Sequence, residues 1–212
     1  MTVEISNFSF TLLPEKALYK TDERLLIIAD VHLGKATHFR KEGISIPAQA
    51  QQEDYVNLEI LFKKITPLKV YFLGDLFHSK MNTDWYFFCN LIEQFPEIEF
   101  TLIKGNHDLI DDAKFDELCI KVVDAIEDTV FIYSHKPLPE ESNHKVNIAG
   151  HIHPGIVLTG IGRQSVKLPC FYRTDTLVIV PAFGTLTGLY SMDRAAASAI
   201  YAVLPDCVRR VV

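Results

Sequence analysis

Short apolar runs recur along the first two thirds of the chain, and most of them end at a glycine or a polar residue. They are rich in β-branched residues and have the length of strands that are buried on both faces. The pattern predicts five such strands, at residues 24–30, 68–75, 98–104, 129–135 and 146–150.

Helical spacing separates some of these strands. In residues 47–65 the apolar side chains recur every three or four positions, and Pro47 suits the first turn of a helix. Residues 82–95 predict a second helix, because polar residues that can cap it precede Trp85. Strands that alternate with helices indicate right-handed crossovers and a mostly parallel sheet.

The pattern changes after His153, where glycine and proline interrupt short apolar segments without helical spacing. This part predicts an antiparallel sheet of hairpins, with strands at residues 165–172, 176–180 and 197–204. No repeat and no long Pro/Gly/Ser linker divides the chain. We therefore expect one domain over residues 1–212, of mixed α/β class, with two sheets and helices on the outer faces.

Ionisable or amide side chains follow all five predicted strands. In chain order they are Asp30 with His32, Asp75, the run Asn106, His107 and Asp108, then His135, and finally His151 with His153. One Asp or His at such a place is usually a turn residue or a structural side chain. Five successive examples at the same edge of one sheet instead predict a shared site, because open α/β sheets bind ligands at the carboxyl ends of their strands.

The donor types indicate metal binding. Carboxylate, amide and imidazole groups without thiolate suit manganese, iron, magnesium or zinc. Asp30 and His32 lie two apart on an expected extended chain, so both can face one ion. Asp75 can bridge two ions, whereas the spacing of His151 and His153 leaves open whether they share one. Glycines before Asp75, Asn106 and His151 leave space for metals and a phosphate.

Charge and cysteine content narrow the classes of protein. The net charge of −6 does not favour a constitutive nucleic-acid binder, which usually presents a basic face. Four scattered cysteines, no secretion signal and no membrane-length apolar run predict free thiols and a cytoplasmic location without membrane attachment. Nucleotide-dependent functions are disfavoured because neither a phosphate-binding loop nor a dinucleotide fingerprint is present.

The ordered motifs Asp-x-His, Gly-Asp, Gly-Asn-His-Asp, a single His and Gly-His-x-His resemble the calcineurin-like metallophosphoesterase superfamily over residues 25–154. This resemblance implies a four-layer αββα sandwich and two divalent ions, with manganese favoured. It also implies the ligands of each ion: Asp30, His32, Asp75 and His153 for one, and Asp75, Asn106, His135 and His151 for the other. His107 would stabilise or protonate the leaving oxygen, and Asp108 would orient the His107 ring.

A narrower resemblance rests on the segments 29–35, 38–43 and 73–79 and on the glycine-rich segment 181–188. They are similar to the ligase-associated DNA damage response endonucleases. That resemblance implies a manganese-dependent phosphodiesterase acting on DNA in repair, with a DNA ligase and a helicase as partners. His78 stands where the broader superfamily often has Asp or Asn, and it can be a substrate contact or a structural support.

Basic residues near the first motif have two interpretations. Lys35, His38, Arg40 and Lys41 can hold phosphates that flank the scissile one, or they can form a solvated helix face. Phe39 among them can stack on a base. Arg163, Lys167 and Arg173 are weaker candidates for the same role.

Three functions are compatible with these observations. The first is a DNA phosphodiesterase or endonuclease, which the narrower resemblance favours. The second is a phosphodiesterase or phosphatase acting on a small nucleotide or metabolite, which the acidic balance favours. The third is a non-catalytic scaffold, which is disfavoured because every expected ligand position and His107 are filled.

Overall fold

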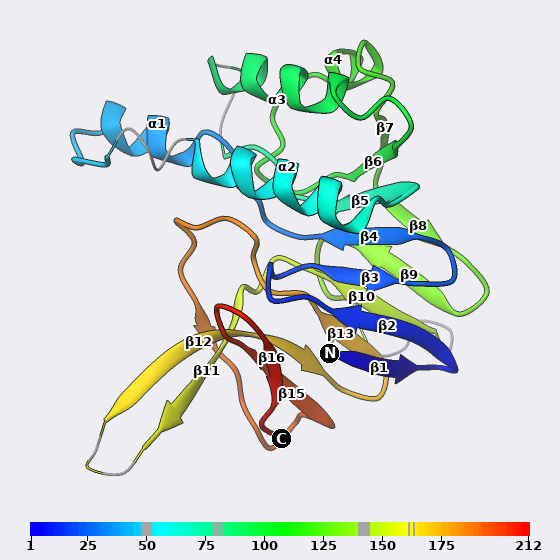
Figure 1. The fold of residues 1–212 in the computed structure, drawn as a ribbon, viewed down its shortest axis with the longest axis vertical. Coiled ribbons are helices and arrows are strands. Elements are labelled where there is room, and N and C mark those ends of the chain that lie inside the picture. Colours follow the sequence, from blue (N-terminus) through cyan, green and yellow to red (C-terminus); the bar gives the residue numbers. More distant parts are fainter. Residues whose placement is uncertain (48–51, 79–80, 82, 140–144, 161, 163) are drawn as a thin grey trace.

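The computed structural model describes residues 1–47, 52–78, 81, 83–139, 145–160, 162 and 164–212. Figure 1 shows two packed sheets with helices beside the first of them. No helix in these described ranges is long and apolar enough to cross a membrane.

The first sheet places its strands in chain order. They are β1 (Thr2–Ile5), β2 (Phe8–Leu12), β3 (Leu18–Lys20), β4 (Leu25–Ile28), β5 (Lys69–Leu73), β6 (Glu99–Ile103) and β7 (Lys121–Val123). The strands from β1 to β4 are antiparallel, and those from β4 to β7 are parallel. The parallel part contains the predicted crossovers.

The helices of the described residues all belong to the part of the chain that builds this first sheet. They are α1 (Lys35–Lys41), α2 (Glu53–Ile65), α3 (Thr83–Glu93) and α4 (Asp112–Asp116). Leu58 and Phe62 of α2 and Phe88 of α3 share a buried cluster with Ile28 of β4 and Phe72 of β5. This cluster joins the helices to one face of the sheet.

The second sheet has the order β14, β11, β12, β13, β10, β9, β8, with β15 paired to β12 and β16 to β15. Its strands are β8 (Ala125–Glu127), β9 (Phe131–Ser134), β10 (Val146–Ala149), β11 (Pro154–Thr159), β12 (Ser165–Arg173), β13 (Leu177–Ile179), β14 (Tyr190–Ser191), β15 (Ala199–Val203) and β16 (Val208–Arg210). The strands β9, β10 and β13 are parallel to one another, so this half is not entirely the antiparallel hairpin sheet that we expected.

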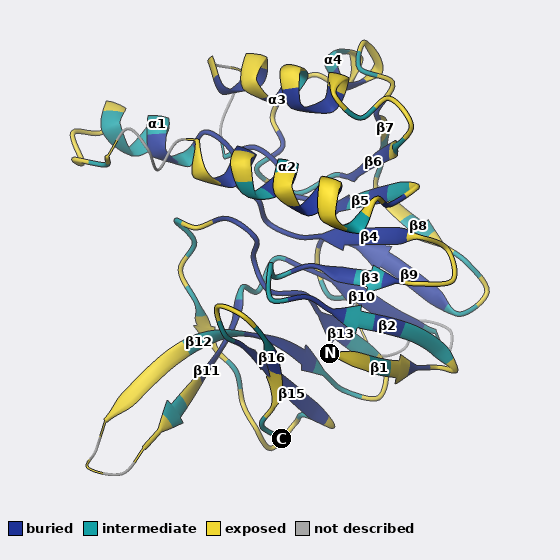
Figure 2. Ribbon diagram, in the orientation of Figure 1, coloured by how far each residue is buried: buried dark blue, intermediate teal, exposed yellow. Residues whose placement is uncertain are grey.

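All four residues of β4 are apolar and buried. Leu25 and Ile27 lie in the cluster between the sheets with Phe131 and Ile148, whereas Leu26 and Ile28 face the helices. Successive side chains of a strand point to opposite faces, so a strand covered on both faces is apolar throughout. Figure 2 shows this central strand as buried along its length.

The expected mixed α/β class with two sheets is confirmed. The helices in the described part of the chain pack on the first sheet. The second sheet has an apolar cluster of its own that includes Ile156, Tyr172 and Ile200. No described segment after α4 is helical.

The predicted elements agree with the structure except at their ends. All eight predicted strands are present, each shorter than or close to its predicted length. The helix expected at residues 47–65 begins at Glu53, and Pro47 lies outside it. Residues 48–51 and 82 of the two predicted helices lie outside the described residues.

Candidate metal centre

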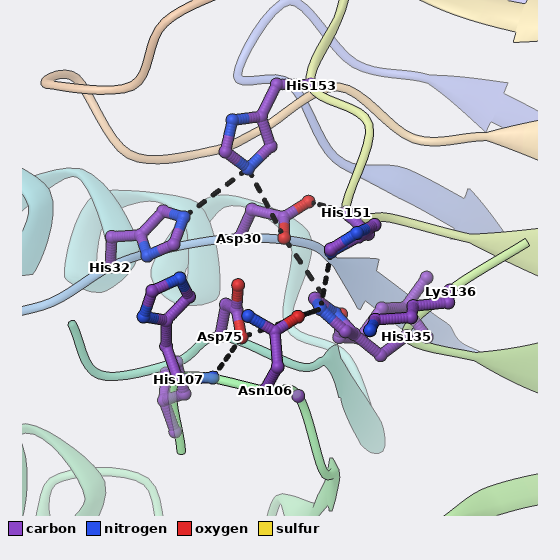
Figure 3. A network of polar contacts seen from close by, with 12 residues as sticks. Asp30, His32, Asp75, Asn106, His107, His135, Lys136, His151 and His153 are labelled. Carbon is purple, nitrogen blue, oxygen red and sulfur yellow. Dashed lines mark hydrogen bonds and ion pairs between the residues drawn. The ribbon is translucent and has the colours of Figure 1, made fainter. Parts of the chain in front are cut away.

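Two different sheets supply the polar side chains that follow the predicted strands. Asp30, Asp75 and Asn106 follow strands β4, β5 and β6 of the first sheet, while His135 and His151 follow β9 and β10 of the second. Figure 3 shows these side chains converging at one place. The expectation of one shared site is therefore supported, but its position at the edge of a single sheet was wrong.

The side chains form two adjacent groups, in each of which the candidate ligand atoms lie within 4.8 Å of one another. In the first group, Nε2 of His153 lies 3.4 Å from Nε2 of His32 and 3.5 Å from Oδ1 of Asp30. This group therefore combines residues that follow β4 with a residue that follows β10.

The second group contains Asp75, His135 and His151. Nε2 of His135 lies 3.0 Å from Nδ1 of His151, 3.5 Å from Oδ1 of Asp75 and 3.2 Å from Oδ1 of Asn106. His151 and His153 thus belong to different groups, which answers the question that their spacing left open.

Several atoms of the site fit a cation better than they fit one another. Oδ1 of Asp30 is buried and has no hydrogen-bond partner. Nδ1 of His135 lies 2.9 Å from the carbonyl oxygen of Leu73, which can only accept, so the proton of a neutral ring sits on Nδ1. The lone pair on Nε2 then faces the amide oxygen of Asn106, and these two acceptors repel each other. A metal ion bound to both atoms would remove this repulsion.

Two candidate metal ligands, His32 and His151, are held in the neutral form that binds metals. Burial, assisted by the nearby Lys35 ammonium, lowers the pKa of His32 to about 2. Burial also lowers the pKa of His151, with His135 and Lys136 acting in the same direction. A neutral imidazole has a free lone pair at neutral pH, as coordination requires.

The two candidate carboxylates are fixed by backbone amides of the opposite loops. His151 N–H donates to Oδ2 of Asp30 at 2.8 Å, and His107 N–H donates to Oδ1 of Asp75 at 2.8 Å. Each loop thereby sets the position of a ligand on another loop.

Five of the candidate ligands have left-handed backbone: Asp30 (φ 52°), His32 (φ 53°), Asp75 (φ 50°), His151 (φ 69°) and His153 (φ 53°). The extended conformation expected for the Asp30–His32 pair was therefore wrong. This conformation is uncommon for residues with a side chain, and such strain concentrates at functional sites.

The glycines before the ligands make room for neighbouring ligand side chains. A Cβ added to Gly105 would lie 2.3 Å from Oδ1 of Asp75, and one added to Gly150 would lie 2.7 Å from Oδ2 of Asp30. The space that we expected metals and a phosphate to need is thus occupied in part by the carboxylates themselves.

His107 lies at the rim of the site. Its ring is half-buried and its centroid is 5.6 Å from that of His32. The His78 ring stacks on it at 5.4 Å, and His38 of α1 contacts the other side of His78 at 4.9 Å. Burial and the charge of Lys35 lower the pKa of His78 to about 4, so His78 is neutral at this rim.

Asp108 has a different environment from the one we expected. Its carboxylate is buried and accepts hydrogen bonds from the backbone N–H groups of Gly105, Asp75, Leu76 and Phe77 at 2.8–3.2 Å. Burial raises the pKa of Asp108, and the backbone donors oppose that shift. Asp108 therefore ties the loop after β5 to the loop after β6, in place of the expected contact with the His107 ring.

The candidate substrate-binding residues differ in their distance from the site. Lys35 is half-buried, and its ammonium is attracted by Asp75 and Asp30, which raise its pKa against the larger lowering effect of burial. Arg40 lies further along α1, where it donates to Oγ1 of Thr37 at 3.4 Å. Lys167 and Arg173 instead donate to the carbonyl oxygens of Leu189 and Glu4, and Arg163 lies outside the described residues.

Lys136 is a neighbour of the site that the sequence reasoning missed. It follows His135 directly, is exposed, and lies beside the second ligand group in Figure 3. The signal was available, since a lysine adjacent to a candidate ligand is a candidate phosphate contact.

A model of the calcineurin-like phosphoesterase family matches residues 23–136, more than half of the chain, so the protein belongs to this family. It is accordingly a phosphoester hydrolase of a family that uses divalent metal ions. Among solved structures, nuclease MPE of Pseudomonas putida is similar to it, with 29% identity, 96% of each chain covered and a TM-score of 0.81. A comparison with curated proteins gives no match. The family inferred from the motifs is confirmed, together with its likeness to a nuclease.

Proposed function

We propose that the chain is a metal-dependent phosphodiesterase that cleaves DNA as an endonuclease. The observation that carries this proposal is the pair of adjacent ligand groups around Asp75. The similarity to a nuclease over 96% of both chains supports the choice of substrate. Residues 1–212 act as one domain in this proposal, and the free cysteines support a cytoplasmic location.

Each ligand group holds one divalent ion. Asp30, His32, Asp75 and His153 would hold the first ion, and Asp75, Asn106, His135 and His151 would hold the second. Manganese fits this mixture of oxygen and imidazole donors, and iron, magnesium and zinc are the alternatives. Two bound ions would supply Lewis acidity and would help a water molecule lose a proton near neutral pH.

The protein's own residues position the reaction and supply a proton. The backbone N–H of His107 is anchored on Oδ1 of Asp75, which fixes the ring relative to the ligands. From the rim, His107 donates a proton to the departing sugar oxygen, a poor leaving group without protonation. Asp108 holds the loops of Asp75 and Asn106 together through its four backbone contacts.

The basic residues of α1 provide a local exception to the acidic balance of the chain. Lys35 lies near the metal groups, and Arg40 follows on the same helix. We propose that they contact phosphates that flank the scissile one, with His78 as a further contact. A net charge of −6 favours the second candidate substrate, a small phosphodiester. Participation in DNA repair with a ligase and a helicase remains a proposal that rests on the motif resemblance.

The test compares wild-type protein with His107→Asn on two substrates in the presence of manganese. On end-labelled DNA we expect the variant to be slower by about 100-fold or more, because general acid catalysis contributes roughly 10²–10⁴. On an aryl phosphodiester, whose leaving group needs no proton, we expect nearly the wild-type rate. Gel analysis of single- and double-stranded DNA and a colour assay measure the two rates.

Two outcomes contradict parts of the proposal. Equal slowing on both substrates, with lower metal content, would make His107 a ligand. Intact DNA alongside hydrolysis of a small phosphodiester would leave the metal centre in place and move the substrate to the second candidate.

A further inference from the structure

Segment 182–187, in the loop that follows β13, lies directly behind the first ligand group. Ala182 forms a parallel bridge with Ala29 at the end of β4. Phe183 N–H donates to the carbonyl of Ala29 at 2.8 Å, and Gly184 N–H donates to the carbonyl of Asp30 at 3.2 Å. The segment therefore pairs with the chain directly after β4, where Asp30 and His32 lie, although it follows a strand of the second sheet.

The same loop also contacts the end of β10. Val180 N–H donates to the carbonyl of Ala149 at 2.8 Å, two residues before His151. Residues 180–184 thus link the turn that carries His151 and His153 to the turn that carries Asp30 and His32. These two turns supply the complete first ligand group.

Two charged side chains of opposite sign hold this segment from different elements. Nζ of Lys16, in the turn between β2 and β3, donates to the carbonyl of Phe183. Oδ1 of Asp54, in the first turn of α2, accepts from Thr185 N–H at 3.0 Å. Asp54 is only 8% exposed, and burial raises the pKa of its carboxyl group to about 6, while the Thr185 contact and the nearby Lys16 ammonium oppose part of that shift.

Asp54 also lies close to a ligand. Together with Leu186 it lines one small cavity that His32 and Lys35 line from the other side. The left-handed backbone of Asp30 and His32 persists only where the surrounding structure fixes it. The loop after β5 holds the N–H groups of Asp30 and His32, and the contacts from Phe183 and Gly184 hold the carbonyls of Ala29 and Asp30 from the other chain segment. Lys16 and Asp54 bind this second segment at Phe183 and Thr185.

We propose that Lys16 and Asp54 are positioning residues for the first metal ion. They hold segment 182–185 against residues 29–31, so that Asp30 and His32 point at the same ion as His153. We expect the second ligand group to be independent of the clamp formed by Lys16 and Asp54, because these side chains bind Phe183 and Thr185, whereas the turn of His151 pairs with Val180. The inference rests on the proposed metal-dependent function, and it makes no use of the identity of the substrate.

The experiment measures manganese affinity in two backgrounds that each retain one ligand group. His135→Ala disables the second group, and His153→Ala disables the first. Titration of metal-free protein, followed by the electron paramagnetic resonance signal of free manganese, gives the affinity of the remaining group. Asp54→Ala, Asp54→Asn and Lys16→Met are made in each background, with Glu59→Ala on the outer side of α2 as the matched control.

We expect Asp54→Ala and Lys16→Met to weaken manganese binding about 10-fold in the His135→Ala background, since partners of metal ligands typically contribute 10–100-fold. In the His153→Ala background we expect no change. Asp54→Asn retains an oxygen that accepts from Thr185 and should restore the affinity, and Glu59→Ala should have no effect. Should Asp54→Ala fail to fold, Lys16→Met carries the same test.

The proposal would be overturned if Asp54→Ala and Lys16→Met left manganese affinity unchanged in both backgrounds, or weakened it equally in both. Failure of Asp54→Asn to restore the affinity would also overturn it. Wild-type protein that binds no manganese would remove the proposed function and this inference together. Wild-type protein that binds two ions but leaves DNA intact would remove only the nuclease assignment, and the clamp would still be measurable.

Discussion

At the scale of single residues, Asp75 links several parts of the site. Its Oδ1 accepts from His107 N–H and lies 3.5 Å from Nε2 of His135, and its backbone N–H donates to Asp108. One side chain thus relates the second ligand group to the proposed proton donor. Its proposed role as the bridge between two ions gives it the largest expected effect on activity.

Asp75→Asn tests that role. Asparagine keeps an oxygen that can accept from His107 N–H, so we expect the fold to persist. We expect the rate of hydrolysis to fall by more than about 100-fold, because loss of a residue that only supports a metal ligand already costs up to about 100-fold. Circular dichroism and the hydrolysis rate measure the two effects. Asp116→Asn, an exposed carboxylate of α4, is the control and should be silent. Full activity in Asp75→Asn would remove Asp75 from the ligand set.

Which residues gather at the site could be read from the sequence, because each motif is local to the end of one strand. The backbone conformation of Asp30 and His32 could not, since left-handed φ at a non-glycine residue depends on tertiary contacts such as those from Phe183. The same reason explains Asp108, whose partners lie up to 33 residues away.

At the scale of elements, Asp108 joins two loops that follow neighbouring parallel strands. For Asp108→Asn we expect a loss of roughly 3 kcal/mol in the free energy of unfolding, since hydrogen bonds to a charged group contribute about 1.5–3 kcal/mol each and asparagine offers one acceptor. Urea unfolding of metal-free protein measures this loss without contributions from bound ions.

The matched control is Asp112→Asn, which loses an ion pair with Lys104 while its side chain is 51% exposed. An exposed pair contributes little, so we expect less than about 1 kcal/mol. A similar loss in both variants would contradict the role of Asp108 as a tie between the loops.

The buried parallel strands were predictable because short, continuous apolar runs rich in β-branched residues are typical of strands that are buried on both faces. The strands β1 to β3 were missed although β2 carries a signal, the alternation of Phe8, Phe10 and Leu12 with Ser9 and Thr11. That period of two is typical of a strand with one strongly buried face. Apolar periodicity does not tell which sheet a strand joins. The sequence therefore could not show that three of the five strands that precede the ligands belong to the first sheet and two to the second.

At the scale of the whole molecule, both ligand groups combine residues from the two sheets. Bound ions would therefore cross-link the sheets. At a manganese concentration of 100 times Kd, each ion adds about 2.7 kcal/mol. Since each kcal/mol shifts the Tm of a chain this long by roughly 2–4 °C, we expect chelation to lower the Tm by at least about 5 °C.

Differential scanning calorimetry with manganese and with EDTA measures this shift. A variant with both His151→Ala and His153→Ala serves as the control, because it removes the ligands that follow β10. We expect no manganese-dependent shift in that variant. An unchanged Tm in the wild type would contradict ion binding across the sheets.

The separation of the ligands along the chain has a consequence during synthesis. Nε2 of His32 and Nε2 of His153 lie 3.4 Å apart although the two residues are 121 positions apart in the sequence. A growing polypeptide therefore cannot complete the first ligand group until residue 153 has left the ribosome and β10 has docked against its neighbours. Long-range pairings of this kind form late in folding. The first ligand group, and any hydrolysis that needs it, can therefore appear only after both sheets have formed.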